Sequence, residues 1–242
     1  MTEKKPATPG KKKKPKRRTA REGAVRVKSG GKRKDSSKRW LERHLNDPYV
    51  RDATRLGYRS RAAFKLREMD DKQRLIKPGM VVIDLGAAPG GWTQVAVERG
   101  AGKVIGLDIL PMEPVPGATI LQMDFMDEDA PEALIAAAGE GVDVVLSDMA
   151  PNTMGHKATD HLRIMALADL AYDFAAQVLK PGGAFVCKVF QGGAQHDLLQ
   201  LLKRDFASVK HVKPPASRKE SSEQYVVATG FRGTKDRAGF EQ

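Results

Sequence analysis

Short apolar segments alternate with helical segments between residues 80 and 231. Apolar runs of strand length cover residues 80–86, 103–110, 119–125, 142–150, 182–193, 208–214 and 223–231. The segments between them at 91–100, 131–139, 160–179 and 197–206 have the apolar spacing of helices. Strands that alternate with helices are typical of a mostly parallel sheet with helices on both faces. The sequence therefore predicts an α/β fold, preceded by two or three short helices after residue 36.

The positive charge of the chain is concentrated near its start. Residues 1–40 contain 17 Lys and Arg against 3 Asp and Glu, or 17 − 3 = +14. The other 202 residues contain 42 − 17 = 25 basic and 30 − 3 = 27 acidic side chains, or −2. A segment with so much charge and so little apolar surface does not fold alone, and its cations bind phosphates. We expect a disordered, nucleic-acid-binding arm at residues 1–36, with a merely solubilising tail as the alternative.

The remaining composition excludes several classes of protein. No apolar run reaches the roughly 18 residues of a membrane span, and the Lys-rich start is unlike a signal peptide. The single cysteine, Cys187, excludes an internal disulfide and a cysteine-rich metal site. We therefore expect a cytoplasmic protein that binds no metal and no membrane. Its main domain is predicted at residues 37–232, followed by a short tail at 233–242.

Polar residues or glycines stand at the ends of five consecutive predicted strands. The first strand runs into the loop "DLGAAPGGW", and the next three end at Asp108, Asp124 and Asp148. The fifth, "GGAFVCKVFQGG", carries Lys188 inside an otherwise apolar run, where an unpaired ammonium would be costly. Ligands of such sheets bind at the carboxyl ends of the strands. The series of polar strand ends therefore indicates a ligand site.

The glycine loop and two of the aspartates predict an adenosine site. The loop spacing differs from the G-x-G-x-x-G pattern of dinucleotide-binding proteins. Asp108 is placed to accept both hydroxyls of a ribose, and Asp124, between Met123 and Phe125, to accept from an exocyclic amine. A helix cap or a turn is the structural alternative for each aspartate alone. Together they fit S-adenosylmethionine better than a nicotinamide dinucleotide.

Four charged residues are candidates for catalysis. Asp148 and Lys188 end strands that we expect to be parallel neighbours, so that the two charges meet across a crevice. A structural ion pair is the alternative, although buried pairs are weak evidence for stability. Lys65 interrupts an apolar helical stretch, and Glu223 opens the last strand, with Glu220 as a competitor. Taken alone, Lys65 and Glu223 would be ordinary surface residues.

Five motifs in this order resemble the FtsJ-type RNA ribose 2′-O-methyltransferases, especially the members that modify large-subunit ribosomal RNA. They are "SRAAFKL", "DLGAAPGGW", "SDMAPN", "KVFQG" and "SSEQYVVATG", within residues 37–230. The resemblance implies a Rossmann-like class I S-adenosylmethionine-dependent methyltransferase fold with a seven-stranded, mostly parallel sheet. It implies methylation of a uridine ribose in ribosomal RNA, within the large subunit. We also expect the protein to be a monomer.

The resemblance also assigns the site residues by motif. It implies a catalytic group of Lys65, Asp148, Lys188 and Glu223. The spacing from the tyrosine of "YVVATG" selects Glu223 rather than Glu220. The implied positions for S-adenosylmethionine are Gly90, Trp92, Asp108, Asp124 and Asp148.

A ribose hydroxyl must lose its proton as it attacks the sulfonium methyl group. A lysine can accept that proton only when burial or a nearby cation favours its neutral form. The apolar neighbours of Lys188 and the predicted proximity of Lys65 favour this, whereas Asp148 and Glu223 oppose it. Our hypothesis is that Lys188 accepts the proton, Asp148 and Lys65 orient the hydroxyl, and Glu223 holds a lysine in place.

Other functions are less well supported by the sequence. Methylation of an exocyclic amine goes with an Asp/Asn-Pro-Pro-aromatic tetrapeptide, which Asp148-Met149-Ala150-Pro151 does not match. Cytosine C5 methylation needs a nucleophilic cysteine, and Cys187 adjoins Lys188, so it points to the opposite face of the strand. A transfer-RNA methyltransferase, a non-catalytic ribosome-assembly factor and a nicotinamide-dependent dehydrogenase remain as alternatives.

Overall fold

The computed structural model describes residues 35–151, 157–191 and 196–233, and it divides the chain into two compact units. The first unit, residues 1–46, contains helix α1 (Asp35–Leu45), and the second comprises residues 47–242. The predicted basic arm at 1–36 lies almost entirely outside the described residues, as do Gly192, Gly193 and nearly all of the tail at 233–242. The domain boundaries at 36 and 232 therefore stay predictions.

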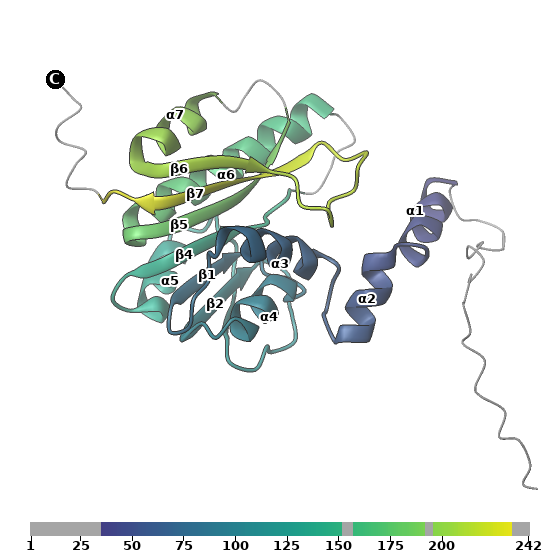
Figure 1. The fold of residues 1–242 in the computed structure, drawn as a ribbon, viewed down its shortest axis with the longest axis horizontal. Coiled ribbons are helices and arrows are strands. Elements are labelled where there is room, and N and C mark those ends of the chain that lie inside the picture. Colours follow the sequence, from purple (N-terminus) through teal and green to yellow (C-terminus); the bar gives the residue numbers. More distant parts are fainter. Residues whose placement is uncertain (1–34, 152–156, 192–195, 234–242) are drawn as a thin grey trace, which may run out of the picture. The chain divides into compact units, whose positions relative to one another are not determined.

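The second unit contains six helices among its described residues (Figure 1). They are α2 (Pro48–Leu56), α3 (Ala62–Gln73), α4 (Gly91–Glu98), α5 (Ala130–Ala138), α6 (Lys157–Val178) and α7 (His196–Asp205). The start of α2 shows how the sequence sets a boundary. The Asp47 carboxylate accepts a hydrogen bond of 3.0 Å from the backbone N–H of Tyr49, which caps the helix, and Pro48 takes its first position.

Seven strands form one sheet in the order β3-β2-β1-β4-β5-β7-β6. Their bounds are β1 (Val81–Leu85), β2 (Lys103–Asp108), β3 (Thr119–Gln122), β4 (Val142–Ser147), β5 (Leu179–Phe190), β6 (Phe206–Val212) and β7 (Glu223–Phe231). The pairs among β3, β2, β1, β4 and β5 are parallel, whereas β7 runs antiparallel to both β5 and β6. The predicted α/β fold and mostly parallel sheet are thus confirmed.

Two hydrophobic cores lie on opposite faces of this sheet, because successive side chains of a strand alternate between faces. On one face α3 and α4 pack against residues such as Val82, Val144 and Val186. On the other face α5, α6 and α7 pack against residues such as Ile83 and Cys187. Figure 1 shows α3 and α4 together on one side of the strands. Each central strand is therefore apolar on both faces, as the sequence predicted.

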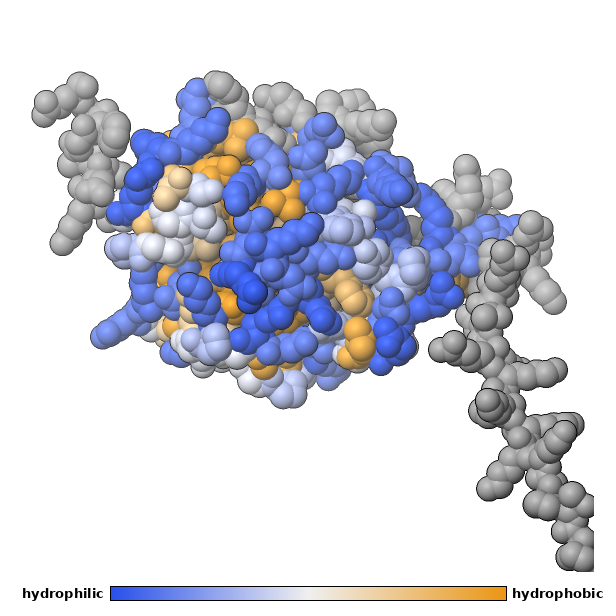
Figure 2. All heavy atoms as spheres, viewed as in Figure 1, coloured by the Kyte–Doolittle hydropathy of each residue, from blue (hydrophilic) through white to orange (hydrophobic). Residues whose placement is uncertain are grey.

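The outer surface above α3 and α4 is mainly hydrophilic, with hydrophobic atoms in separate patches (Figure 2). Throughout the described ranges, no helix combines the length and the apolar character that crossing a membrane would require. The same ranges contain no group of three or more His, Cys, Asp or Glu side chains arranged to hold a metal ion.

Candidate active site

The carboxyl ends of the central strands converge where the sequence predicted a ligand. Strand β4 lies between β1 and β5, so the residues that follow these strands share one edge of the sheet. The backbone N–H of Asp148 donates to the Leu85 carbonyl at the end of β1, over 3.1 Å. The N–H of Gly86 donates to the Leu107 carbonyl of β2, over 2.9 Å. These bonds join the glycine loop to both neighbouring strands.

Lys188 and Asp148 form the predicted pair. The Lys188 Nζ lies 2.8 Å from Asp148 Oδ1 and also donates to the Asp148 backbone carbonyl over 2.7 Å. Only 9% of Lys188 is exposed, so its ammonium is held by these two oxygens rather than by bulk water. The expectation that the two strands are parallel neighbours is confirmed, because β4 pairs with β5 in parallel register.

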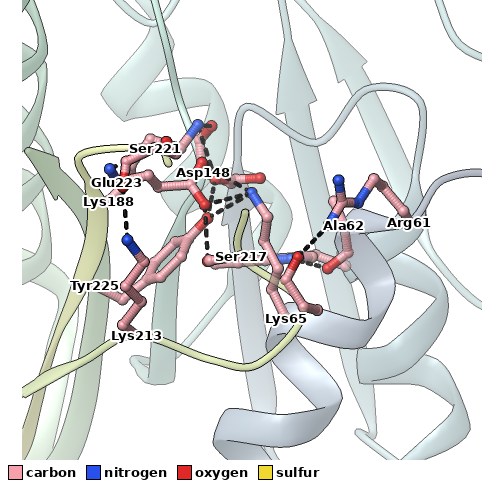
Figure 3. A network of polar contacts seen from close by, with 12 residues as sticks. Arg61, Ala62, Lys65, Asp148, Lys188, Lys213, Ser217, Ser221, Glu223 and Tyr225 are labelled. Atoms are coloured by element: carbon pink, nitrogen blue, oxygen red, sulfur yellow. Dashed lines mark hydrogen bonds and ion pairs between the residues drawn. The ribbon is translucent and has the colours of Figure 1, made fainter. Parts of the chain in front are cut away.

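Tyr225 joins this pair to the other two charged residues, and the sequence reasoning did not assign it a role. Its hydroxyl donates to Asp148 Oδ1 over 2.7 Å and accepts from Lys65 Nζ over 3.0 Å (Figure 3). Tyr225 lies directly opposite Lys188 in the antiparallel pair of β5 and β7. It lies two positions after Glu223 in the same strand, so both side chains share a face. That alternation was the signal in the sequence that could have identified it.

Lys65 and Glu223 form the second ion pair of the site. The Lys65 Nζ lies 2.8 Å from Glu223 Oε1 and 2.9 Å from Oε2. Ser217, buried in the loop before β7, donates its hydroxyl to Glu223 Oε1 over 2.9 Å. Figure 3 shows Lys65 reaching from its helix toward Glu223 and Tyr225. The structure therefore brings together all four residues proposed for catalysis, whereas Glu220 is exposed.

The loop between β6 and β7 is tied to the helix that carries Lys65. The Arg61 guanidinium, at the start of α3, donates to the Ala216 carbonyl, and the backbone N–H of Ala216 donates to Glu68 Oε2 over 2.7 Å. Lys213 Nζ closes the loop by donating to the Ser221 carbonyl over 2.6 Å. The loop thus holds Ser217 beside Glu223 at a fixed distance from α3.

The electrostatics of the network favour an ionised Asp148. Burial by itself would raise the pKa of the Asp148 carboxyl, but the ammonium groups of Lys188 and Lys65 outweigh it, and the net pKa is lowered. Burial, together with the carboxylates of Asp148 and Glu223, raises the pKa of Tyr225 well above its ordinary value. Tyr225 therefore remains a neutral hydroxyl, which donates to one charged side chain and accepts from another.

The glycine loop comes close to its neighbours at two positions. Gly86 has φ +78°, and a Cβ placed there would lie 2.8 Å from Met149 Cγ. Gly90 has φ +108°, and a Cβ there would lie 2.9 Å from Met112 Cε and 3.0 Å from an Arg59 nitrogen. Only glycine fits these conformations and spaces. The loop then enters α4 at Gly91.

Trp92 lies beneath this loop rather than at its surface. It is 3% exposed, its indole N–H donates to the Ala62 carbonyl over 2.8 Å, and its ring lies 5.5 Å from that of Tyr225. Its side chain thus joins the loop to α3 and to the Tyr225 network. Contact between Trp92 and a cofactor stays a prediction.

Asp108 ends β2, whereas the neighbouring β3 ends at Gln122, so Asp124 lies two residues beyond the strand that the sequence predicted it to end. Asp108 Oδ2 accepts from the Ala88 N–H over 2.9 Å, and its Oδ1 accepts from the Leu110 N–H over 2.8 Å. Asp124 Oδ1 accepts from the Met126 N–H over 3.0 Å. Each carboxylate oxygen keeps a further lone pair for a ligand. Both aspartates are therefore partly used in turns, and both can still accept from hydroxyl or amine groups.

Exposed apolar side chains flank these two carboxylates. Ile109 is 60% exposed and Met126 is 61% exposed. Large apolar groups in water beside hydrogen-bond acceptors indicate a ligand with a flat apolar ring and polar edges. The set of side chains present thus fits the adenosine part of S-adenosylmethionine.

Asp84, within β1, is a buried carboxyl near the site that the sequence reasoning did not single out. It is fully buried, and its Oδ2 accepts from the Thr93 hydroxyl over 2.7 Å. Its Oδ1 has no hydrogen-bond partner among the described residues. Burial raises the pKa of Asp84 to about 7, against the hydrogen bond from Thr93, while the charges of Asp148 and Asp108 raise it further. The Asp84 carboxyl, two residues before Gly86, is therefore protonated below about pH 7 and ionised above it.

Cys187 lies on the opposite face of β5, as predicted. It belongs to the core formed with α5, α6 and α7 and is 0% exposed, and burial raises the pKa of its thiol. It neither reaches the network around Lys188 nor ionises readily. This geometry gives no support to the alternative of a cysteine nucleophile.

The strand order, the glycine loop after β1 and the charged network at the strand ends define an α/β methyltransferase fold. A family model described as FtsJ-like methyltransferase matches residues 58–231. The chain belongs to this FtsJ-like methyltransferase family.

Relatives and a solved structure agree with this family. The chain is 62% identical over 215 residues to the Ribosomal RNA large subunit methyltransferase E of Nitrobacter hamburgensis, covering 87% of this chain and 94% of the relative. It is 62% identical over 212 residues to the protein of the same name from Acidiphilium cryptum, covering 88% and 94%. A crystal structure described as a ribosomal RNA methyltransferase from Plasmodium falciparum matches with a TM-score of 0.66 and 32% identity, covering 73% of this chain and all of that one.

Proposed function

We propose that this chain transfers a methyl group from S-adenosylmethionine to the 2′-hydroxyl of a uridine ribose in large-subunit ribosomal RNA. The observation that carries the proposal is the continuous network from Lys188 through Asp148 and Tyr225 to Lys65, at the strand ends beside the glycine loop. The names of the relatives support ribosomal RNA as the substrate, and the family supports methyl transfer. The modification would belong to ribosome maturation in the cytoplasm.

The residues of the chain fit S-adenosylmethionine as the methyl donor. In this proposal Asp108 accepts from the ribose hydroxyls, Asp124 accepts from the adenine amine, and the glycine loop with Gly90 approaches the methionine part; the free lone pairs of the two carboxylates support these roles. When bound, S-adenosylmethionine supplies a methyl group on a positively charged sulfur. The ionised Asp148 at the end of β4 favours binding of that positive charge.

The network has the parts that activation of a ribose hydroxyl requires. The 2′-oxygen forms a bond to the methyl carbon, and the carbon–sulfur bond breaks with its electron pair going to sulfur. The hydroxyl proton goes to Lys188 Nζ, which can accept it only as a neutral amine, after the ammonium has released its own proton. Asp148 and Lys65 orient the hydroxyl, and Glu223 holds Lys65 through both of its oxygens. Because the network is fixed before the substrate binds, orientation contributes much of the rate.

Replacing Lys188 tests this function. Lys188→Ala should abolish methyl incorporation into large-subunit ribosomal RNA while S-adenosylmethionine still binds, as measured by methyl transfer and by calorimetric titration. Lys180→Ala is the matched control, because Lys180 belongs to the same strand but is 43% exposed and pairs with Asp143. Near-normal transfer by Lys188→Ala would overturn the proposed role of the lysine.

Two other functions make different predictions in the same assay. A methyltransferase specific for transfer RNA would incorporate methyl groups into that RNA and not into ribosomal RNA. A non-catalytic assembly factor would incorporate none into either, although it would bind both RNA and the ribosome. Mapping the methylated nucleotide in RNA from wild-type and deletion strains would identify the target.

A further inference from the structure

A cavity of about 380 Å³ lies where the end of α2 meets α3 and α4. Arg67 and Tyr58 belong to its polar lining and Leu56 to its apolar lining, and no residue proposed for catalysis or for the cofactor lines it. The buried Val115 lines it as well and lies against Gly90, so this side chain closes the cavity toward the glycine loop. Apolar walls with a few polar groups are typical of a binding site.

The guanidinium of Arg67 is held by one neighbour and leaves most of its donors unused. Its Nη1 donates to the Tyr58 hydroxyl over 2.9 Å, and its Cζ lies 5.6 Å from the centre of the Tyr58 ring. Within the described residues, the side chain of Arg67 forms no other hydrogen bond and no ion pair. An arginine has five N–H donors, so this one can still bind an oxyanion in bidentate fashion.

Tyr58 links Arg67 to the carboxylate of Glu98 without an ion pair between the two charges. The Tyr58 hydroxyl accepts from Arg67 and donates to Glu98. Burial and the hydrogen bond to Glu98 raise the pKa of Tyr58, so its hydroxyl stays protonated and keeps donating. The cation is thus held in place before a ligand binds. Because Glu98 reduces the local positive charge, the cavity suits a singly charged phosphodiester better than a dianion.

The helices on the two faces of the sheet differ in charge. Residues 48–74 and 91–99, which contain α2, α3 and α4, have 9 basic and 5 acidic side chains, or 9 − 5 = +4. Helices α5, α6 and α7 on the other face have 4 basic and 6 acidic side chains, or 4 − 6 = −2. The cavity therefore lies on the face that attracts a polyanion.

Three carboxylates repel one another on the face of α6 and α7. Burial raises the pKa of Asp169, and the charges of Asp173 and Asp197 raise it further. None of the three forms an ion pair with a described residue. An RNA strand carries a negative charge at every nucleotide, so this face repels it. We therefore expect the substrate strand to pass over α3 rather than over α6.

Arg67 belongs to the same helix as Lys65. The two residues lie two positions apart, which turns their side chains about 200° around the helix axis. Lys65 faces Glu223 and Tyr225, so Arg67 lies on the other side of α3. A helix with its side chains is about 10–12 Å across. A short stretch of RNA can therefore place one ribose at Lys65 and the phosphate of a nearby nucleotide at Arg67.

We propose that Arg67 and this cavity bind a phosphodiester of the substrate RNA, a few nucleotides from the methylated ribose, with the attached sugar against Leu56. The inference rests on the proposed function, because it takes RNA as the substrate. It assigns the face of α2, α3 and α4 to the RNA strand. It also makes Arg67 a substrate-binding residue outside the catalytic network.

Filter binding and steady-state methyl transfer with large-subunit ribosomal RNA test the inference. Arg67→Gln should lower the slope of log K against log salt by about 0.7–0.9, which weakens RNA binding about five- to eightfold near 0.1 M salt. The KM for RNA should rise by the same factor, while kcat and the affinity for S-adenosylmethionine stay at the wild-type values. Arg67→Lys keeps the charge and loses the bidentate geometry, so it should keep the slope and raise the KM less.

Arg163→Gln is the matched control, because Arg163 is an exposed arginine of α6 and its loss changes the net charge equally. It should leave the slope and the KM unchanged. An equal fall of the slope in both glutamine variants would show that the slope reports net charge rather than a site, and would overturn the inference.

Two further outcomes would overturn it. An unchanged slope in Arg67→Gln would show that no phosphate binds there. A weaker affinity for S-adenosylmethionine in that variant, with the slope unchanged, would assign the cavity to the cofactor. Absence of methyl transfer by the wild-type protein, in contrast, would contradict the proposed function, while the slope would still measure the contact of Arg67 with RNA.

Discussion

At the scale of single residues, the site depends on a tyrosine that carries no charge. The hydroxyl of Tyr225 lies between the Lys65 ammonium and the Asp148 carboxylate and is bonded to both. Without it, these two charged groups would have no common partner in the network. The tyrosine is 0% exposed, so water does not replace it readily. We therefore regard Tyr225 as a positioning residue for the two charged groups.

Tyr225→Phe should lower kcat by about 10- to 100-fold, because hydrogen bonds to charged groups contribute about 1.5–3 kcal/mol. The affinity for S-adenosylmethionine should change less than kcat, since Tyr225 bonds to one of the three carboxylates implied for the cofactor, Asp148, which the variant retains. Single-turnover methyl transfer and titration with the cofactor measure the two quantities.

Tyr172→Phe provides the comparison for this change. Tyr172 is also buried, and its hydroxyl donates to the Asp205 carboxylate, on the face of α6 and α7. Its replacement should reduce stability without changing kcat. If both variants kept the wild-type kcat, the bridging role of Tyr225 would be wrong.

Asp84 predicts a pH dependence of folding stability. Its pKa is about 7 in the folded chain against an ordinary 3.8, so the folded state holds a proton that the unfolded state releases. The stabilisation is therefore complete below about pH 4 and is lost as the pH rises to about 7. Compared with Asp84→Asn, the wild-type protein should lose on the order of 4 kcal/mol across this interval.

Urea unfolding of both proteins between pH 4 and pH 8 measures the difference in stability between wild type and Asp84→Asn. The stability of the wild-type protein relative to Asp84→Asn should fall up to about pH 7 and stay constant above it. Thr93 is retained in both proteins, so the comparison isolates the ionisation of the carboxyl. A difference that does not change with pH would mean that Asp84 is already ionised at pH 4.

The sequence revealed some of these residues and not others. Lys188 was conspicuous because a cation interrupts an apolar strand, and an ammonium there requires a partner. Tyr225 and Asp84 were not, because tyrosine is common in strands and an aspartate near a glycine loop is common in turns. Their roles depend on which side chains oppose them, and that is decided by strand register.

At the scale of elements, the direction of β7 completes the site. Because β7 runs antiparallel to β5, its first residue, Glu223, pairs with Phe190 near the carboxyl end of β5. A parallel strand would place its first residue at the opposite edge of the sheet. The alternation of strands and helices predicted the sheet but not this reversal, since a run such as 223–231 reads the same in either direction. The Glu223 assignment came from the family motif instead.

Gly86 shows how closely two elements of the site approach. A side chain at this position would meet the backbone of Met149 at 2.9 Å, directly after Asp148. Gly86→Ala should therefore displace the end of β4 and lower methyl transfer at least about tenfold. Thermal unfolding should show a loss of stability larger than the roughly 1–2 kcal/mol that a positive φ costs any L-residue.

Gly182→Ala separates the cost of a positive φ from the cost of a steric contact. Gly182 has φ +85°, and a Cβ there would meet nothing within 4 Å, so only the conformational cost applies. This variant should lose about 1–2 kcal/mol and keep its activity. Equal behaviour of the two variants would mean that the contact with Met149 adjusts without cost.

At the scale of the whole molecule, charge and chemistry are divided between different parts of the chain. Residues 1–36 contain 15 Lys and Arg against 3 acidic residues, or 15 − 3 = +12, whereas the catalytic groups all belong to the unit of residues 47–242. Cations on a polymer chain neutralise phosphates and release counterions without reading sequence. We therefore expect residues 1–36 to provide affinity for RNA and the unit of residues 47–242 to provide the specificity of the reaction.

Deletion of residues 1–36 should flatten the salt dependence of RNA binding. Each phosphate that the segment neutralises contributes about 0.7–0.9 to the slope of log K against log salt, so four contacts would remove about 3. Filter binding to large-subunit ribosomal RNA between roughly 50 and 200 mM salt measures this slope. Deletion of residues 233–242, with 2 basic and 2 acidic residues, is the matched control and should leave the slope unchanged.

Deletion of residues 1–36 should also raise the KM for RNA with little effect on kcat, because it removes no group of the network. An unchanged slope after the first deletion would identify the segment as a solubilising tail.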